Sequence, residues 1–176
     1  TSLSSVILDI DINKGEKVKI NSITFKGLNE FSAKKLKRTL KETKEKKFFR
    51  IFKTSKFLDK AFKNDLEQII NLYNEKGYRD AQIVLDNIDE ISPNLIDINI
   101  TIEEGIQYHY RNIDWLGNTK YNSEYLDLLL GIKSGDVYDQ KMMNERLQMS
   151  MSGTDITSLY MNDGYLFFNI DPVEIL

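Results

Sequence analysis

Few residues in this chain could support catalysis, and they are scattered. His109 is the single histidine, and there is no Cys to join it in a zinc site or to act as a thiol nucleophile. Asp89-Glu90 and Glu103-Glu104 are carboxylate pairs of the kind used in acid–base catalysis. They lie at expected strand ends and turns, where solvated charge is the simpler interpretation. The sequence therefore carries no enzyme signature, and no metal or cofactor is expected.

A second chemical feature is a strong asymmetry of charge. Residues 34–63 include 13 Lys/Arg and 3 Asp/Glu, a net charge of +10, while the remainder has 11 basic and 24 acidic residues, a net charge of −13. Clustered cations bind nucleic-acid phosphate or an anionic membrane surface. Lys outnumbers Arg and no stacking aromatic platform is evident, so a solvated helical face is the simpler interpretation. The residues of this basic patch are Lys34, Lys35, Lys37, Arg38, Lys41, Lys44, Lys46 and Lys47.

Apolar spacing predicts a strand followed by two helices. Ile20–Lys26 alternates like a strand and ends at Gly27, which supplies the backbone freedom for a turn. Ser32 is the expected N-cap of the first helix. A second helix is expected from Asp59, its cap, to Gly77, because apolar residues recur between them on one helical face.

Two strands joined by a tight connection are expected next. Ala81–Asp86 alternates, with a continuation toward Ile91, and Leu95–Ile102 alternates again. The turn signal Ser92-Pro-Asn94 between them predicts an antiparallel hairpin. The fold class is therefore α+β, a β-α-α-β-β unit. Its strands leave edges with unpaired N–H and C=O groups, which can take up an extended peptide by β-augmentation.

The same order of elements returns in the second half of the chain. Gly27 and Gly117 are 90 positions apart, and so are Ile23 and Ile113. Such repetition indicates an array of like modules. The elements expected here are a strand over Tyr108–Leu116, helices capped by Ser123 and Asp139, a break over Ser150–Asp155, a helix resumed at Asp155 and a strand over Leu166–Ile170, with no closing strand.

The first residues repeat the pattern of a third strand. Ser5–Ile12 alternates as Leu95–Ile102 does, and Gly15 stands 90 positions before Gly105. The expected organisation is the last strand of a preceding module in residues 1–15, a module in 16–104 and a module lacking its final strand in 105–176. One hypothesis is that Ser5–Ile12 of one molecule completes the second module of another.

The order of these motifs resembles the POTRA (polypeptide-transport-associated) family over nearly the whole chain. Tandem modules are most similar to the periplasmic arm of the BamA family of outer-membrane β-barrel assembly proteins. The stretches Gly135–Tyr138 and Gly164–Glu174 resemble versions from Bacteroidetes. Leu28, which follows the turn glycine, and the break over Ser150–Asp155 depart from the family pattern. The matching stretches are Ile23–Asn29, Leu72–Tyr78, Ile100–Gly105, Ile113–Asn118, Lys133–Tyr138 and Leu159–Tyr165.

The resemblance implies a fold and a set of partners. Each module is implied to be a small mixed three-stranded sheet with two helices on one face. The modules are implied to lie in the periplasm, N-terminal to a membrane barrel, where they receive unfolded outer-membrane proteins and dock accessory lipoproteins. The second strand of each module is implied to be the edge used for augmentation, so proline at Val84 or Leu85 should weaken binding. The implied edge residues are Ala81, Gln82, Ile83, Val84, Leu85, Asp86, Leu166, Phe167, Phe168, Asn169 and Ile170.

Two other functions stay open at this point. One is the POTRA arm of another outer-membrane translocation or secretion transporter. The other is a nucleic-acid-binding protein that uses Lys34–Lys63, although the preferred prediction has no nucleic-acid partner. A DNA titration over a salt series separates these functions, because phosphate binding by cations weakens steeply as salt rises.

Overall fold

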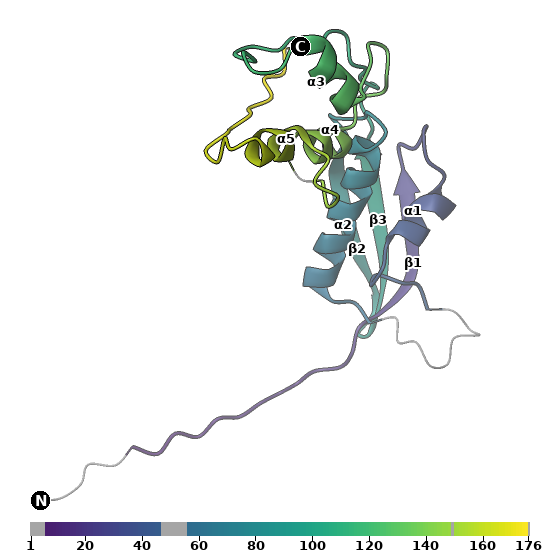
Figure 1. Ribbon diagram of the computed structural model, residues 1–176. Coiled ribbons are helices and arrows are strands. Elements are labelled where there is room, and N and C mark those ends of the chain that lie inside the picture. The colour runs from purple at the N-terminus through teal and green to yellow at the C-terminus, as the bar shows by residue number, and fades with distance from the viewer. Residues whose placement is uncertain (1–5, 47–55, 149, 176) are drawn as a thin grey trace, which may run out of the picture.

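The structure, a computed structural model, describes residues 6–46, 56–148 and 150–175 (Figure 1). A β-α-α-β-β unit comes first, and three helices follow it in the described part of the second half. The elements are β1 (Lys19–Lys26), α1 (Ala33–Thr39), α2 (Asp59–Asn74), β2 (Gln82–Ser92), β3 (Leu95–Glu103), α3 (Ser123–Leu130), α4 (Gln140–Leu147) and α5 (Ile156–Asn162).

The three strands form one mixed sheet in which β3 is the central strand. β1 runs parallel to β3, because β2 starts at the end of the sheet where β1 finishes and carries the chain back to the end where β1 begins. β2 runs antiparallel to β3 across a tight turn, so the predicted hairpin is confirmed. In this register Ile23 lies beside Ile98, and Phe25 lies beside Ile100. The sheet order therefore leaves β1 and β2 as its two edges.

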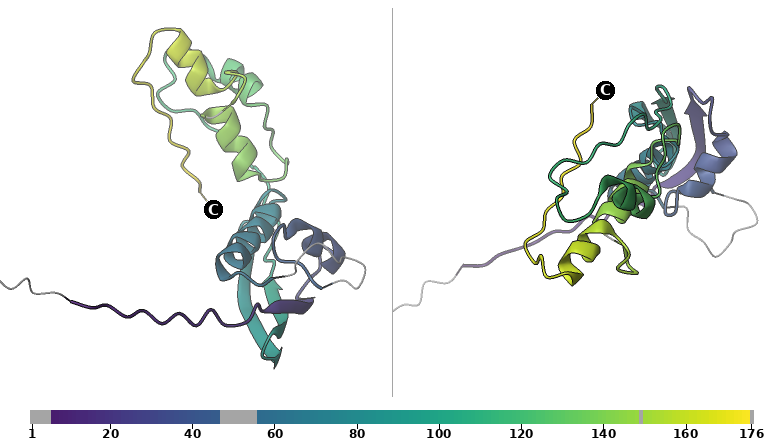
Figure 2. Two further views of the ribbon diagram at one scale, coloured as in Figure 1. Left: turned by 90° about the horizontal axis from the view of Figure 1, so that it is seen from below. Right: turned by 45° about the horizontal axis from the view of Figure 1, so that its top comes forward.

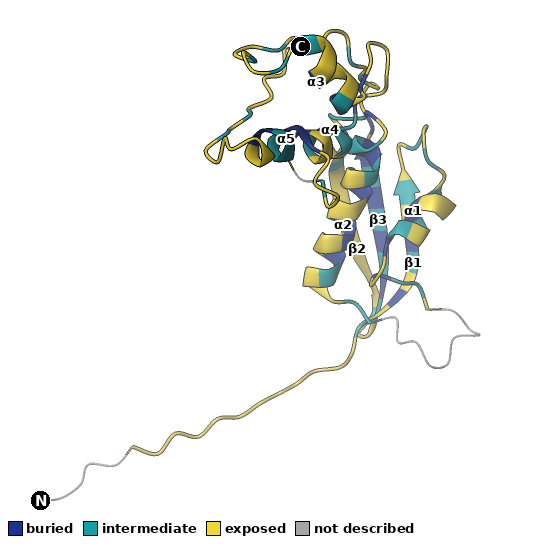
Figure 3. Ribbon diagram, viewed as in Figure 1, coloured by how far each residue is buried: buried dark blue, intermediate teal, exposed yellow. Residues whose placement is uncertain are grey.

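The core of this unit lies between one face of the sheet and the two helices. The isoleucines of β3 alternate with half-buried polar residues, which gives the strand one apolar face. Figure 3 shows the buried residues following β3 along its length. The predicted arrangement of two helices on one face is confirmed. The buried core comprises Ile20, Ile23, Leu36, Leu40, Phe62, Ile69, Tyr73, Ala81, Ile96, Ile98, Ile100 and Ile102.

Glu104 ties the turn after β1 to the end of α2. Its carboxylate accepts hydrogen bonds from the backbone N–H groups of Asn29 (3.0 Å) and Glu30 (3.1 Å) and from the Tyr73 hydroxyl (2.7 Å). Burial alone would raise the pKa of Glu104, but these hydrogen bonds outweigh it and hold the pKa below its ordinary value. Glu104 is only 6% exposed. The interpretation of Glu103-Glu104 as solvated turn charge is therefore wrong for Glu104 and holds for the exposed Glu103.

Helices α3, α4 and α5 pack around a second core in residues 106–175. Among the described residues of this half no strand forms, and a single isolated bridge joins His109 to Val137. The predicted strands over Tyr108–Leu116 and Leu166–Ile170 are therefore wrong for this structure. The reason is that outer strands pair through a central strand, as β1 and β2 do through β3, and no segment of residues 106–175 takes that place.

The predicted helix starts are right at three positions and wrong at two. Ser32, Asp139 and Asp155 each accept a hydrogen bond from the backbone N–H three residues later, so the break before α5 is also confirmed. Ser123 is not a cap, because Asn122 takes that place and accepts the hydrogen bond from the Tyr125 N–H. Asp59 is not a cap either: it is the first residue of α2 and pairs with Lys63.

Residues 6–14 run away from the body of the molecule as an extended segment (Figure 1). They lie in no strand, so the predicted strand over Ser5–Ile12 does not form in this structure; residue 5 lies outside the described residues. Val6, Leu8, Ile10 and Ile12 are 71–92% exposed. These side chains are apolar at alternate positions, as in β3, and they have no sheet to cover them.

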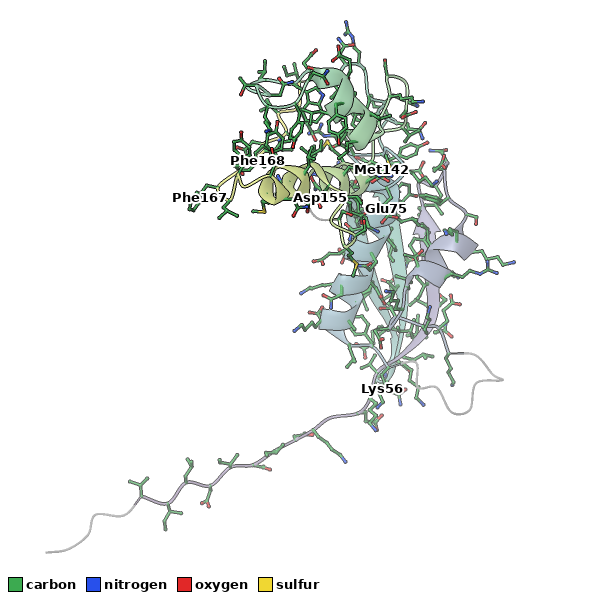
Figure 4. All side chains as sticks on the ribbon, viewed as in Figure 1. Lys56, Glu75, Met142, Asp155, Phe167 and Phe168 are labelled. Atoms are coloured by element: carbon green, nitrogen blue, oxygen red, sulfur yellow. The ribbon has the colours of Figure 1, made fainter. Side chains whose placement is uncertain are left out.

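The two halves meet at the turn that follows α2, where Figure 2 shows them as two joined lobes. The Tyr108 N–H donates to the carbonyl of Gly77 (2.8 Å), and the Tyr108 hydroxyl donates to the Asp80 carboxylate (2.6 Å). Lys141, at the start of α4, pairs with Glu75 (2.9 Å), which Figure 4 labels beside α4. Contacts of both backbone and side chains therefore join the halves.

Candidate strand-binding edge

The outer edge of β1 is covered by the connection between α1 and α2. The Lys46 N–H donates to the carbonyl of Ile20 (2.7 Å), and the Phe57 N–H donates to the carbonyl of Val18 (2.9 Å). Lys56 forms an antiparallel bridge to the start of β1, and its label in Figure 4 stands at this end of the sheet. These backbone contacts lie at the start of β1, and the Ile23 N–H farther along donates to the Glu45 carboxylate (2.9 Å). Because the first half of this edge already has partners, β1 is a poor place for an incoming strand.

The outer edge of β2 has no such cover. In the part of the chain that the structure describes, no hydrogen bond from another segment reaches the backbone of β2 outside its ladder to β3. The strand runs over Gln82–Ser92 and is longer than the expected Ala81–Asp86. Ala81 precedes the strand and is buried, because it packs into the core of the β-α-α-β-β unit. It is therefore not an edge residue.

Two irregularities divide β2 and define its usable part. The register to β3 shifts between Ile83 and Leu85 and again between Glu90 and Ser92. Such bulges interrupt pairing, so the stretch Leu85–Glu90 is where an added strand can follow the ladder. Residues 87–90 are missing from the predicted edge set, although the expected continuation toward Ile91 covers them.

One face of this regular stretch is shared with the helices. Cross-strand partners lie on the same face of a sheet. Asp86, Ile88 and Glu90 lie opposite isoleucines of β3, on the face that the helices cover. Ile88 is still 40% exposed, since it lies on the outermost strand. This face of the edge therefore presents an apolar side chain between two carboxylates.

The other face of the regular stretch is open and mostly polar. Leu85, Asn87 and Asp89 lie on this face, and Leu85 is 55% exposed. The Asp89 carboxylate accepts hydrogen bonds from the side-chain amides of Asn87 (2.7 Å) and Asn99 (2.8 Å). These bonds fix the position of Asp89 at the rim of the sheet, beside the open edge.

The predicted edge residues of the second half are placed differently. Leu166 and Phe167 lie in a turn after α5, and Phe167 is fully exposed at the outer end of the molecule (Figure 4). Phe168 turns inward and stacks on Tyr160, with ring centroids 4.0 Å apart and planes 9° apart. Asn169 and Ile170 continue in no strand. This segment is therefore not an edge strand in the structure.

The basic patch is partly occupied by structural contacts. Lys37 pairs with Glu45 (2.7 Å), and the Lys44 ammonium donates to the carbonyls of Lys37 and Leu40 at the end of α1. The buried Asp65 of α2 accepts bonds from the backbone of the same Lys-rich stretch. The exposed members of the patch are Lys34, Lys35, Arg38, Lys41 and Lys46, and Lys47 lies outside the described residues.

The described residues contain no cluster of side chains that could hold a metal ion. No three His, Cys, Asp or Glu side chains of this part of the chain gather closely enough to hold a metal ion. His109 is exposed. No helix within residues 6–46, 56–148 and 150–175 is both long and apolar enough to cross a membrane. The uncovered edge of β2 is therefore the candidate site.

Comparison with known proteins agrees with this architecture. The POTRA family model, described as "Surface antigen variable number repeat", matches residues 18–105 and 108–175. The chain belongs to the POTRA family. Its fold is also similar to the crystal structure of Haemophilus influenzae BamA POTRA3-5, with a TM-score of 0.55 and 22% identity, over 78% of this chain and 54% of that one.

Two full-length relatives carry the name "Outer membrane protein assembly factor BamA". The protein of Buchnera aphidicola is 28% identical over 138 residues, which are 78% of this chain and 22% of that protein. The protein of Neisseria meningitidis serogroup B is 28% identical over 140 residues, which are 78% of this chain and 18% of that protein. The chain thus spans about a fifth of the length of the curated relatives it matches.

Proposed function

We propose that this chain is a periplasmic part of an outer-membrane protein assembly factor. In this role it is not an enzyme: it receives unfolded outer-membrane proteins and docks accessory subunits by β-augmentation. The names of the relatives support the process. The observation that supports the mode of binding is the contrast between the two sheet edges, since β1 is covered and β2 is open.

Main-chain pairing suits a receptor for many different clients. An extended segment that pairs with β2 gains hydrogen bonds from its backbone, which every sequence has. Side chains of the edge then adjust the affinity without deciding it. The regular stretch Leu85–Glu90 is long enough for a short ladder, and bulges at its two ends limit the length of segment that can pair.

We also propose the division of the chain into modules at residues 16–104 and 105–176, with residues 1–15 as the last strand of a preceding module. The likeness of residues 6–12 to β3 supports the assignment of that first segment. Their exposed apolar side chains support it too, because such residues are normally buried in a sheet.

Binding of a labelled, uncharged β-forming peptide, followed by fluorescence anisotropy, tests the proposed mode. Proline is introduced at Asn87 and, separately, at Ile88. Because successive N–H groups of a strand point to opposite sides, one of these variants removes a donor at the open edge and the other disturbs pairing with β3. The variant that loses the donor at the open edge should stay folded. It should bind the peptide about fivefold more weakly or worse, because one hydrogen bond contributes about 1 kcal/mol.

Asn87→Ala is the matched control, since it shortens the side chain and keeps the N–H. Hydrogen exchange on the unaltered chain gives a second readout, in which bound peptide should protect residues 85–90 and leave β1 unchanged. A folded proline variant that binds the peptide as tightly as the unaltered chain would contradict the proposal, and so would protection confined to another segment.

A further inference from the structure

We propose that the open edge of β2 selects strands that carry cationic side chains at fixed positions. This inference rests on the proposed function, because it concerns the side chains of a segment that pairs with β2. It goes further by naming the chemistry of the preferred partner: an extended polypeptide segment in which basic and apolar residues alternate in a defined order.

The open edge of β2 is acidic. β2 includes Asp86, Asp89 and Glu90 and no Lys or Arg. None of the three forms an ion pair with another described residue. The ammonium of Lys63 on α2 is bound to Asp59 at 2.8 Å, which raises its pKa more than the nearby Asp86 does. The three carboxylates therefore remain available to cations on an incoming strand.

The register of the sheet fixes where those cations must lie. Asp86 and Glu90 are on the same face as Ile88, which stands between them. A strand directly opposite needs cation, apolar and cation at alternate positions on that face, since facing side chains interact most strongly. On the other face it needs a cation opposite Asp89 and an apolar residue opposite Leu85. These requirements define one order of side chains for each strand direction.

For a strand antiparallel to β2, the order is Lys-Lys-Val-Thr-Lys-Val, with its first residue opposite Glu90 and its last opposite Leu85. For a parallel strand the order is reversed. In either direction three charge pairs form. Opposite charges across a sheet contribute about 0.2–1 kcal/mol per pair. The three pairs together correspond to about a threefold to a hundredfold preference over an uncharged strand.

The same charges disfavour a second copy of this chain as the occupant. The exposed extended segment of residues 6–12 has an apolar alternation that would suit a sheet edge. It also carries Asp9 and Asp11, and like charges placed opposite one another destabilise a strand pair. The acidic character of the edge therefore points to a basic segment from another protein, and it reduces self-association through β2.

The test compares three labelled peptides: the Lys sequence, a version with Gln at the Lys positions and a version with Glu there. Each peptide is made in both residue orders, one for antiparallel and one for parallel pairing. We expect the Lys peptide to bind the unaltered chain most tightly and the Glu peptide least tightly. The preference should shrink between about 0.05 M and 0.5 M salt, because exposed pairs are screened. The double variant Asp86→Asn, Glu90→Gln should lose most of the preference while still binding the Gln peptide.

The matched control is Glu124→Gln with Glu145→Gln, which removes the same charge from exposed positions on α3 and α4. It should keep the preference. Equal binding of all three peptides, abolished by the folded proline variant, would overturn the charge selection and leave augmentation standing. If no peptide binds, both proposals are overturned. Two results would show general charge attraction and overturn this inference. One is a preference for the Lys peptide that survives in the folded proline variant. The other is a control variant that loses the preference as fully as the Asp86→Asn, Glu90→Gln variant does.

Discussion

Arg79, in the turn after α2, forms an ion pair with Glu174, near the end of the second module. The Nη1 atom of Arg79 lies 2.5 Å from Oε2 of Glu174. The guanidinium carbon lies 5.9 Å from the ring centroid of Tyr108 and 5.8 Å from that of Tyr138, and the Tyr138 hydroxyl donates to Glu174. One cation of the first module therefore meets two rings and a carboxylate of the second, which is suited to fixing the angle between the modules.

Replacing Arg79 with Met should loosen that angle and leave each module folded. Both side chains of the pair are about 30% exposed, so the free energy of unfolding should fall by about 1 kcal/mol or less. The distribution of distances between spin labels placed on α2 and α3 should broaden. Lys63→Met is the control, because it breaks an exposed ion pair far from the junction. An unchanged distance distribution in Arg79→Met would show that the other contacts between the modules are enough to set the angle.

A comparison of Gly77 with Gly164 separates the effect of crowding at the junction from the effect of backbone strain. Both have positive φ (+80° and +92°) and both end a helix through the same pair of backbone hydrogen bonds. A Cβ at Gly77 would lie 2.7 Å from Val137 Cγ1 and 2.9 Å from the Tyr108 carbonyl oxygen, whereas a Cβ at Gly164 meets nothing within 4 Å.

Gly164→Ala should therefore lower the free energy of unfolding by about 1–2 kcal/mol through strain alone. Gly77→Ala should cost about 1–3 kcal/mol more, because the junction must shift to make room. Urea unfolding of the two variants gives the comparison. Equal losses would mean that the second module moves aside at no cost.

The first module is readable from its sequence because its signals are local. The β3 pattern Ile96–Ile102 alternates without a break, and Ser32 has the spacing of a cap, so strand and helix follow from propensity and periodicity. The mixed sheet follows from the same strands plus the hairpin turn. What periodicity does not show is which edge is open: the covering of β1 by Lys46 and Phe57 comes from a connection with no regular pattern.

The second module shows where prediction from local sequence patterns fails. Leu166–Ile170 has the composition of a strand, but strand formation requires a partner, and the central position beside it is empty within residues 106–175. Glu104 is a similar case, because a carboxylate after a strand is usually solvated. Its burial depends on Tyr73 and on the turn at Asn29, which lie far away in the sequence. Both errors concern long-range contacts that a local pattern does not encode.

Replacing Glu104 with Gln should destabilise the first module by about 1.5–3 kcal/mol at neutral pH, the range for hydrogen bonds to a charged group. The folded-state pKa of Glu104 is depressed, so its contribution is present above the unfolded value of 4.5 and is lost as pH falls through the folded pKa. The difference between the unaltered chain and the variant should therefore shrink below about pH 4.5.

Urea titrations at several pH values between neutral and acid measure this difference. Glu103→Gln is the matched control: it changes the same residue type one position earlier, where the side chain is exposed, and should have little effect at any pH. A constant difference across the whole pH range would show that the Glu104→Gln substitution disturbs packing and that the charge of Glu104 contributes nothing.

The extended segment of residues 6–12 should add to the second module of another molecule at high concentration. Its apolar positions match those of β3, the strand that pairs with both neighbours in the first module. In the second module, Tyr108–Leu116 and Leu166–Ile170 have the expected patterns of two outer strands and no partner between them. Light scattering should show a mass that rises with concentration, and circular dichroism should show a gain of β-structure.

Ile10→Lys is the variant that tests this association, because it places a charge in the middle of the apolar face that would be buried. It should return the chain to a monomer without altering the urea unfolding of the first module, since Ile10 contacts neither core. Asp9→Lys is the control: it changes a neighbouring residue on the other face and should permit association. A strict monomer at high concentration, or association that Ile10→Lys leaves intact, would contradict the exchange of this strand.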